Sequence, residues 1–199
     1  MSVKLKGVPL QYANALRRIC LNGVPIFAID TVDIIENSSV LPDEGLAHRL
    51  GLVPLKTDLT RFNEPSNCDC QSEIGCSNCK VMLVLDSGES DITKTIFTDE
   101  LTSEDDGIKP TSEKIPIVQL APGQRVKVEC YARLGRGREH AKWNSANIAT
   151  LVETDKEDER ILTVESTGAL TPEEIILTGV EELGKGIQEF QGTIEKLNE

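Results

Sequence analysis

Aromatic residues are scarce in this sequence, since Phe, Trp and Tyr together make up 4% of its 199 residues. Hydrophobic residues nevertheless reach 39%, so we expect a soluble protein with an aliphatic core. No apolar run approaches the roughly 20 residues of a membrane-spanning helix, which argues against a membrane protein. The first residues contain no apolar segment typical of a signal peptide, so a cytoplasmic protein is expected.

Basic residues and histidines are also few. The 21 Lys and Arg against 33 Asp and Glu give a net charge of −12, which opposes any extensive contact with nucleic-acid phosphates. His48 stands alone near the end of an expected helix, where a structural role is expected. His140 follows Glu139, but no nucleophile or second acid lies nearby in sequence, so no catalytic residue is assigned.

The stretch 171–197 predicts a long helix with one narrow apolar seam. Thr171 can cap it, Pro172 suits its first position and Glu174 completes a capping box. The seam recurs in alternating steps of four and three residues, as in a coiled coil: Ile176, Val180, Leu183, Ile187, Phe190, Ile194 and Leu197. Four glycines interrupt the helix, each at a cost of about 1 kcal/mol relative to alanine. The seam therefore needs a packing partner, either from this chain or from a second polypeptide.

The remaining elements predict an α+β protein with a β-rich middle. Helices are expected at 8–21 and 41–50, a short strand at 3–5, and further strands at 26–36, 81–85, 93–97, 115–120, 124–133 and 161–165. The change of character after 51–55 suggests a domain boundary there. The simplest fold pairs the outer strands in one domain and sets the β-rich segment beside it as an insertion.

Four of the six cysteines lie within twelve residues, at Cys68, Cys70, Cys76 and Cys79. Four thiolates in one loop can surround a tetrahedral ion, so a structural zinc site is the favoured interpretation. An iron–sulfur cluster is the second, although the usual ferredoxin spacing is absent. Reversible disulfides or an empty site complete the alternatives. A closed shell of cysteines leaves no water to activate, so no catalysis is assigned to it.

Basic side chains gather in two places in this acidic chain. The stretch 132–143 holds Arg133, Arg136, Arg138, His140, Lys142 and the only tryptophan, Trp143. Its Gly-x-Gly pair is a weak phosphate-binding signal, because no Gly-Lys-Ser/Thr follows. A basic loop with a tryptophan anchor is typical of a docking surface, and the alternative is a solvated loop with the tryptophan in the core. Arg17 and Arg18 either lie on a solvated face or grip a carboxylate on a partner.

Several separated motifs resemble the D-type subunit of archaeal RNA polymerase. This family is related to the bacterial α N-terminal domain and to the third-largest subunit of eukaryotic polymerase II. The motifs occur in the family's order: Asn14-Ala15-Leu16-Arg17-Arg18, Val24-Pro25, His48-Arg49-Leu50-Gly51-Leu52-Val53-Pro54-Leu55, and Leu134-Gly135 followed by Gly137 and His140-Ala141-Lys142-Trp143.

The resemblance implies two domains and a set of partners. A discontinuous dimerisation domain, residues 1–50 and 160–199, would pair with the small subunit L through Ile176, Val180, Leu183, Ile187, Phe190 and Ile194. An inserted β-rich domain, residues 51–159, would carry the cysteine loop 68–79, which matches the zinc loop of the eukaryotic relative. The side facing the large catalytic subunits would include Asn14, Arg17, Arg18, Arg136, His140, Lys142 and Trp143. The family's usual first strand is expected to be short or missing.

The leading hypothesis is therefore a non-catalytic assembly subunit of a DNA-dependent RNA polymerase. It would have no active site of its own, and with subunits L, N and P it would form a platform for the catalytic subunits. A free-standing metal-binding redox protein that uses the cysteine cluster is the alternative. A nucleic-acid-binding module that uses the basic loop is a third hypothesis, which the net charge of −12 disfavours.

Overall fold

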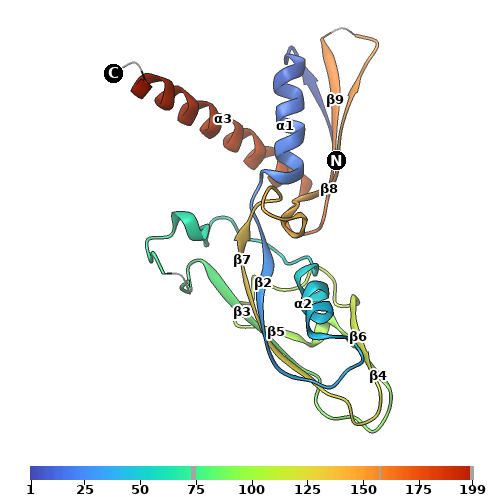
Figure 1. The fold of residues 1–199 in the computed structure, drawn as a ribbon. Coiled ribbons are helices and arrows are strands. Elements are labelled where there is room, and N and C mark those ends of the chain that lie inside the picture. The colour runs from blue at the N-terminus through green and yellow to red at the C-terminus, as the bar shows by residue number, and fades with distance from the viewer. Residues whose placement is uncertain (73–74, 157, 198–199) are drawn as a thin grey trace. The chain divides into compact units, whose positions relative to one another are not determined.

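The fold is given by a computed structural model that describes residues 1–72, 75–156 and 158–197 (Figure 1). The chain forms two compact units, one of Met1–Pro25 with Arg136–Glu199 and the other of Ile26–Gly135. These limits differ from the expected boundaries after residues 50 and 159. The difference follows from strand pairing, because β2 (Ile26–Asn37) pairs along its length with β7 (Val126–Gly135) and both must lie in one unit.

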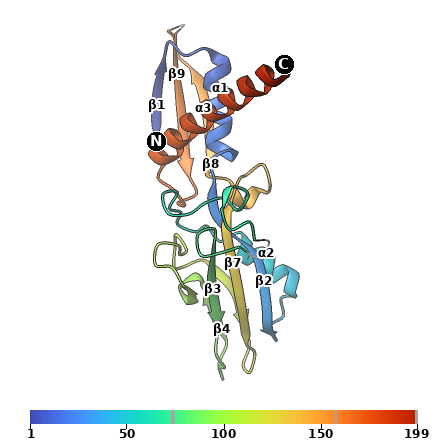
Figure 2. The same cartoon turned by 90° about the vertical axis from the view of Figure 1, so that its left-hand side faces the viewer.

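The first unit combines two helices with a three-stranded antiparallel sheet. The strands, in the order β1-β9-β8, are Ser2–Lys6, Glu159–Ser166 and Ala146–Glu153. The helices are α1 (Leu10–Asn22) and α3 (Pro172–Leu197) (Figure 2). Leu162 and Val164 of β9 are buried, as are Ala13 and Leu16 of α1. All five residues of β1 pair with β9, so the first strand is present.

Strand β8 was not predicted, and its burial pattern explains why. Only Ala146 and Ala149 are buried, whereas Ile148 and Val152 are exposed. The register shift between Ala146 and Ile148 breaks the alternation further. A strand whose large apolar residues face outward has no clear period-two signal.

The second unit is built on a four-stranded antiparallel sheet in the order β2-β7-β3-β5. Strands β3 and β5 span Lys80–Asp86 and Leu101–Ser103, while β4 (Lys94–Phe97) and β6 (Pro116–Leu120) form a separate pair. Helix α2 is Asp43–Gly51. The core is aliphatic as expected, and the rings of Phe27 and Phe62 contact each other in it with their centroids 5.0 Å apart.

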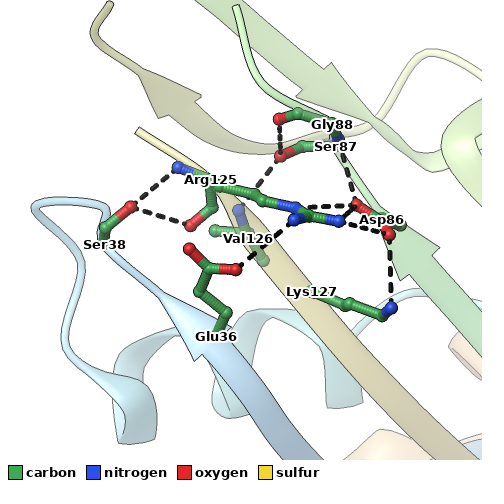
Figure 3. A network of polar contacts seen from close by, with 8 residues as sticks. All are labelled: Glu36, Ser38, Asp86, Ser87, Gly88, Arg125, Val126 and Lys127. Carbon is green, nitrogen blue, oxygen red and sulfur yellow. Dashed lines mark hydrogen bonds and ion pairs between the residues drawn. The ribbon is translucent and has the colours of Figure 1, made fainter. Parts of the chain in front are cut away.

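A polar network ties together the ends of three strands in this unit (Figure 3). The guanidinium of Arg125 lies 2.9 Å from Asp86 Oδ2 and 3.6 Å from Glu36 Oε2. The backbone N–H of Arg125 donates to Ser38 Oγ at 2.7 Å, and that hydroxyl donates to the carbonyl of Arg125 at 3.1 Å. Lys127 adds a second cation 3.6 Å from Asp86 Oδ2. One aspartate therefore holds the start of β7 against the end of β3.

Acid is expected to weaken this network through Asp86. Hydrogen bonds from the Gly88 backbone N–H and from Arg125 lower the pKa of the Asp86 carboxyl. A lowered folded-state pKa contributes stability above the unfolded value of about 3.9, and that contribution disappears as the pH falls through the folded value. Asp86→Asn should therefore lower the urea midpoint at pH 7 and leave a much smaller difference from wild type at pH 3. Asp91→Asn, an exposed neighbour, is the control, and an equal loss at both pH values would contradict this explanation.

Helix α3 approaches α1 closely at one glycine. A Cβ on Gly179 would lie 3.2 Å from Cys20 Sγ and 3.3 Å from Leu16 Cδ1, whereas one on Gly184 would meet nothing within 4 Å. Gly179→Ala should therefore gain less stability than Gly184→Ala, for which up to about 1 kcal/mol is expected. Gly179→Val should destabilise the unit by about 1–3 kcal/mol through overpacking. Urea unfolding of the three variants measures these changes in stability. Equal changes in Gly179→Ala and Gly184→Ala would refute the close packing of Gly179 on α1.

Candidate functional site

The four clustered cysteines converge in the second unit, in the loop before β3. Their Sγ atoms all lie within 4.8 Å of one another. The separations are 3.7 Å for Cys68–Cys76, 3.9 Å for Cys70–Cys79 and 3.8 Å for Cys76–Cys79. A tetrahedral ion with Zn–S bonds of about 2.3 Å requires sulfur atoms about 3.8 Å apart. The donor set and its spacing therefore fit one tetrahedral metal ion.

The loop backbone also presents donors to the sulfur atoms. The N–H of Cys76 donates to Cys79 Sγ at 3.2 Å, and the N–H of Asn78 donates to Cys76 Sγ at 3.4 Å. Gly75 adopts a φ of +88°, which favours glycine, and its Cβ position would be 3.4 Å from Cys79 Sγ. Such hydrogen bonds favour thiolates and fix the orientation of the ligands.

Cys20 and Cys130, which lie outside this cluster, are buried free thiols. Burial raises the pKa of Cys20 to about 11 and that of Cys130 to about 12, so both stay protonated thiols. In the cluster, a hydrogen bond from the Ser72 backbone and bonds from the other thiols lower the pKa of Cys70 to about 7. Burial raises the pKa of Cys79. Metal binding would displace the remaining protons, which couples the loop's order to the ion.

The apolar seam of α3 is largely exposed in the isolated chain. The exposed fractions are 51% for Val180, 50% for Ile187, 66% for Phe190 and 43% for Ile194. The chain's own contacts bury another face, represented by Ile175 and Gly179. Ile176 and Leu183 are half-buried. Figure 1 shows the C-terminal half of α3 extending away from α1, so the described residues leave this strip uncovered.

The polar residues of α1 that were predicted to contact partners differ in their surroundings. Arg17 is turned onto its own unit, because its Nε donates to Asn14 Oδ1 at 3.0 Å and its Nη1 donates to the carbonyl of Ala149 at 3.3 Å. Arg18 is exposed, as is Asn14. Leu10 and Tyr12 on the same helix are also exposed, at 45% and 54%, although Leu10 falls in step with the buried Ala13 and Leu16.

The loop 136–143 is more firmly held than the sequence suggested. Trp143 is 3% exposed, so its ring lies in the core, which is the placement that the alternative interpretation expected for the tryptophan. Arg136 Nη1 lies 2.5 Å from Glu182 Oε2, which directs the Arg136 side chain toward α3. Arg138 and His140 are exposed, and Lys142 is half-buried with its Nζ 4.3 Å from the centroid of the Trp143 ring. His140 Nδ1 accepts a hydrogen bond from the backbone N–H of Lys142 at 3.0 Å.

Comparison with known proteins identifies the family. Residues 24–168 match the family described as the RNA polymerase Rpb3/RpoA insert domain. The chain belongs to this family. The match covers the whole second unit and continues into the first, and the mixed helices and antiparallel sheets agree with the expected α+β class.

Archaeal members of the Rpb3/RpoA family are similar over most of the chain. A DNA-directed RNA polymerase subunit Rpo3 from Methanosphaera stadtmanae is 43% identical over 143 residues, which cover 71% of this chain and 52% of that protein. Subunit Rpo3 from Pyrococcus furiosus is 43% identical over 139 residues, 70% of this chain and 49% of that protein. Subunit Rpo3 from Thermococcus kodakarensis is 36% identical over 210 residues, which cover 93% of this chain and 76% of that protein. The chain spans about half the length of the first two relatives.

No helix among the described residues of this Rpb3/RpoA-family chain has both the length and the apolar content of a membrane span. The four clustered cysteines and the seam of α3 belong to different units. Each of these two features can therefore be tested without altering residues of the other.

Proposed function

We propose that the chain is a non-catalytic assembly subunit of a DNA-dependent RNA polymerase. The observation that carries the proposal is the uncovered apolar strip of α3 in a chain whose relatives are named polymerase subunits. Its role would be to hold other subunits in place, and any catalysis would belong to the large subunits that assemble on it. The cysteine cluster would stabilise the second unit and take no part in the reaction.

The proposed occupant of the α3 seam is the small subunit L. Gly184, Gly186 and Gly192 have no neighbour within 4 Å at their Cβ positions, so this half of the helix receives little support from its own chain. A helix with this glycine content is poorly populated in water unless an apolar face is packed. Burying Ile187 and Phe190 against a second polypeptide would supply part of the roughly 1.5–3 kcal/mol that complete burial of such a side chain is worth, because both are already partly covered.

The large catalytic subunits are the proposed partners of the exposed polar groups in the first unit. Arg18, Asn14, Arg138 and His140 supply these groups, with the half-buried Lys142 beside them, and most of them are basic in a chain of net charge −12. Such cations suit carboxylates on a partner better than nucleic acid, which the overall charge repels. Subunits N and P would complete the platform. Arg136 and Trp143 would support this surface from behind.

The proposed ion in the cysteine cluster is zinc. Three of the sulfur separations are 3.7–3.9 Å and all four sulfur atoms lie within 4.8 Å of one another, which fits a single tetrahedral centre. In an iron–sulfur cluster with several irons, thiolates bound to different irons lie further apart. When bound, such an ion would cross-link the loop and supply no redox chemistry. This interpretation leaves the free-standing redox protein as the less favoured alternative.

Purification alone and with subunit L tests the proposed function. The chain expressed alone should self-associate or precipitate, because the strip of α3 stays exposed. Co-expression with the cognate subunit L should give a soluble one-to-one complex by size-exclusion chromatography with light scattering. A monodisperse monomer that forms no complex with subunit L would contradict the proposal.

A further inference from the structure

One ion pair in the first unit joins the basic loop to the helix that carries the seam. Arg136 Nη1 lies 2.5 Å from Glu182 Oε2 and donates to the carbonyl of Gly23 at 2.6 Å. The side chains of Arg136 and Glu182 are only 17% and 15% exposed. A single guanidinium therefore connects the loop, the end of α1 and the middle of α3.

Both oxygens of the Glu182 carboxylate have partners. Lys185 Nζ donates to Glu182 Oε1 at 2.9 Å from a side chain that is 63% exposed. Burial alone would raise the pKa of Glu182, but the hydrogen bonds from Arg136 and Lys185 outweigh it and lower the pKa. The carboxylate is thus charged at neutral pH, and its partly buried pair with Arg136 is costly to break from one side.

The loop after Arg136 is organised around that residue. The N–H of Glu139 donates to the carbonyl of Arg136 at 2.8 Å, and the N–H of Arg136 donates to Glu139 Oε1 at 3.1 Å. Gly137 leaves no room for a side chain, because a Cβ there would lie 2.8 Å from Asn22 Cβ and 2.1 Å from Asn144 Oδ1. The position of Arg136 therefore helps to determine the positions of the exposed residues Arg138 and His140.

Glu182 lies on α3 between the part of the helix that packs on α1 and the part that has open space around it. It follows Gly179, where the helix packs on α1, and precedes the segment from Gly184 onward that has open space around it. The seam residues Val180 and Ile187 lie on either side of Glu182 along the chain and are about half exposed. A partner that packs on the seam would restrict this part of α3, and with it the Glu182 carboxylate.

We propose that Arg136 and Glu182 are a positioning pair that couples the two docking surfaces, so that packing of subunit L on α3 further restricts the loop 136–144, which the large subunits would contact. This inference rests on the proposed function, since it requires that a partner covers the seam. Such coupling would appear as a difference in loop order between the free chain and the chain bound to subunit L. This difference can be measured without an assay of polymerase activity.

Hydrogen exchange of the loop, with and without subunit L, tests the coupling. The amides of Glu139, Trp143 and Asn144 donate within the loop and report its order. Subunit L should slow their exchange at least fivefold in the wild-type chain. Glu182→Gln should abolish most of that slowing while subunit L binds within threefold of its wild-type affinity. Arg136→Lys, which keeps the positive charge, should retain part of the slowing of amide exchange by subunit L.

Lys185→Gln is the matched control, because Lys185 binds the other oxygen of the same carboxylate from an exposed position on α3. It should keep the wild-type response to subunit L. If subunit L binds and the loop amides exchange equally with and without it, or if Glu182→Gln responds as wild type, the coupling is refuted. If subunit L does not bind the wild-type chain at all, the proposed function fails first, and binding measured separately distinguishes that case.

Discussion

Replacing Ile187 with aspartate is expected to weaken binding of subunit L by at least about 100-fold, which corresponds to roughly 2.7 kcal/mol. Ile187 lies at the centre of the α3 seam and is 50% exposed in the isolated chain. A carboxylate at this position would be buried against an apolar partner without a cation, and such desolvation costs several kcal/mol. Isothermal titration of the chain with subunit L gives the affinity directly.

The control for this variant is Gln188→Asp, which adds the same charge one residue later and off the seam. Gln188 is exposed and falls outside the four-three pattern of the apolar residues. We expect its affinity for subunit L to stay within threefold of wild type. Circular dichroism of both complexes checks that the helix is intact. If Ile187→Asp binds subunit L as tightly as the wild type does, the seam is not part of the interface.

Replacing Cys79 with serine is expected to abolish tight metal binding, from one ion per chain to a stoichiometry near zero. Cys79 is buried, its Sγ lies 3.8 Å from Cys76 Sγ and 3.9 Å from Cys70 Sγ, and it accepts a backbone hydrogen bond. Three remaining thiolates leave the tetrahedral shell open, and serine is a far weaker zinc ligand. Elemental analysis of the purified complex with subunit L measures both the metal and its amount.

Cys130→Ala is the control, because Cys130 is buried in the same unit but lies outside the cluster. It should retain one zinc per chain. Metal affinity in the wild type should fall as the pH is lowered, since protons compete for the four thiolates. A full zinc content in Cys79→Ser would refute the assigned ligand set. Iron with visible absorbance in the wild type would instead favour the redox alternative.

The long helix shows what a sequence pattern can establish. The expected capping box is present, since the N–H of Thr171 donates to Glu174 Oε2 at 2.7 Å and the N–H of Glu174 donates to Thr171 Oγ1 at 3.3 Å. The helix spans Pro172–Leu197, close to the expected 171–197, and the cysteine cluster converges as its spacing predicted. Local chemistry determines a helix start and a loop of ligands, so both can be derived from neighbouring residues.

Features that depend on distant partners were predicted less well. The ion pair between Arg136 and Glu182 joins residues 46 positions apart, and nothing near either residue signals it. The direction of the Trp143 ring is likewise decided by packing, because residue type suits both a docking anchor and a core position. The unit boundaries followed strand pairing between β2 and β7, which the sequence pattern of either strand alone does not reveal.

Protection of the α3 seam by a second polypeptide is tested most directly by chemical labelling. A cysteine introduced at Ile187 should react with a maleimide at least tenfold more slowly after subunit L is added, because that side chain, now half exposed, becomes covered. A cysteine introduced at Glu181, which is exposed outside the seam, should react at the same rate in both cases. Mass spectrometry of the labelled peptides separates these sites from the native cysteines. Unchanged labelling of the Ile187→Cys chain in the presence of subunit L would contradict the central claim.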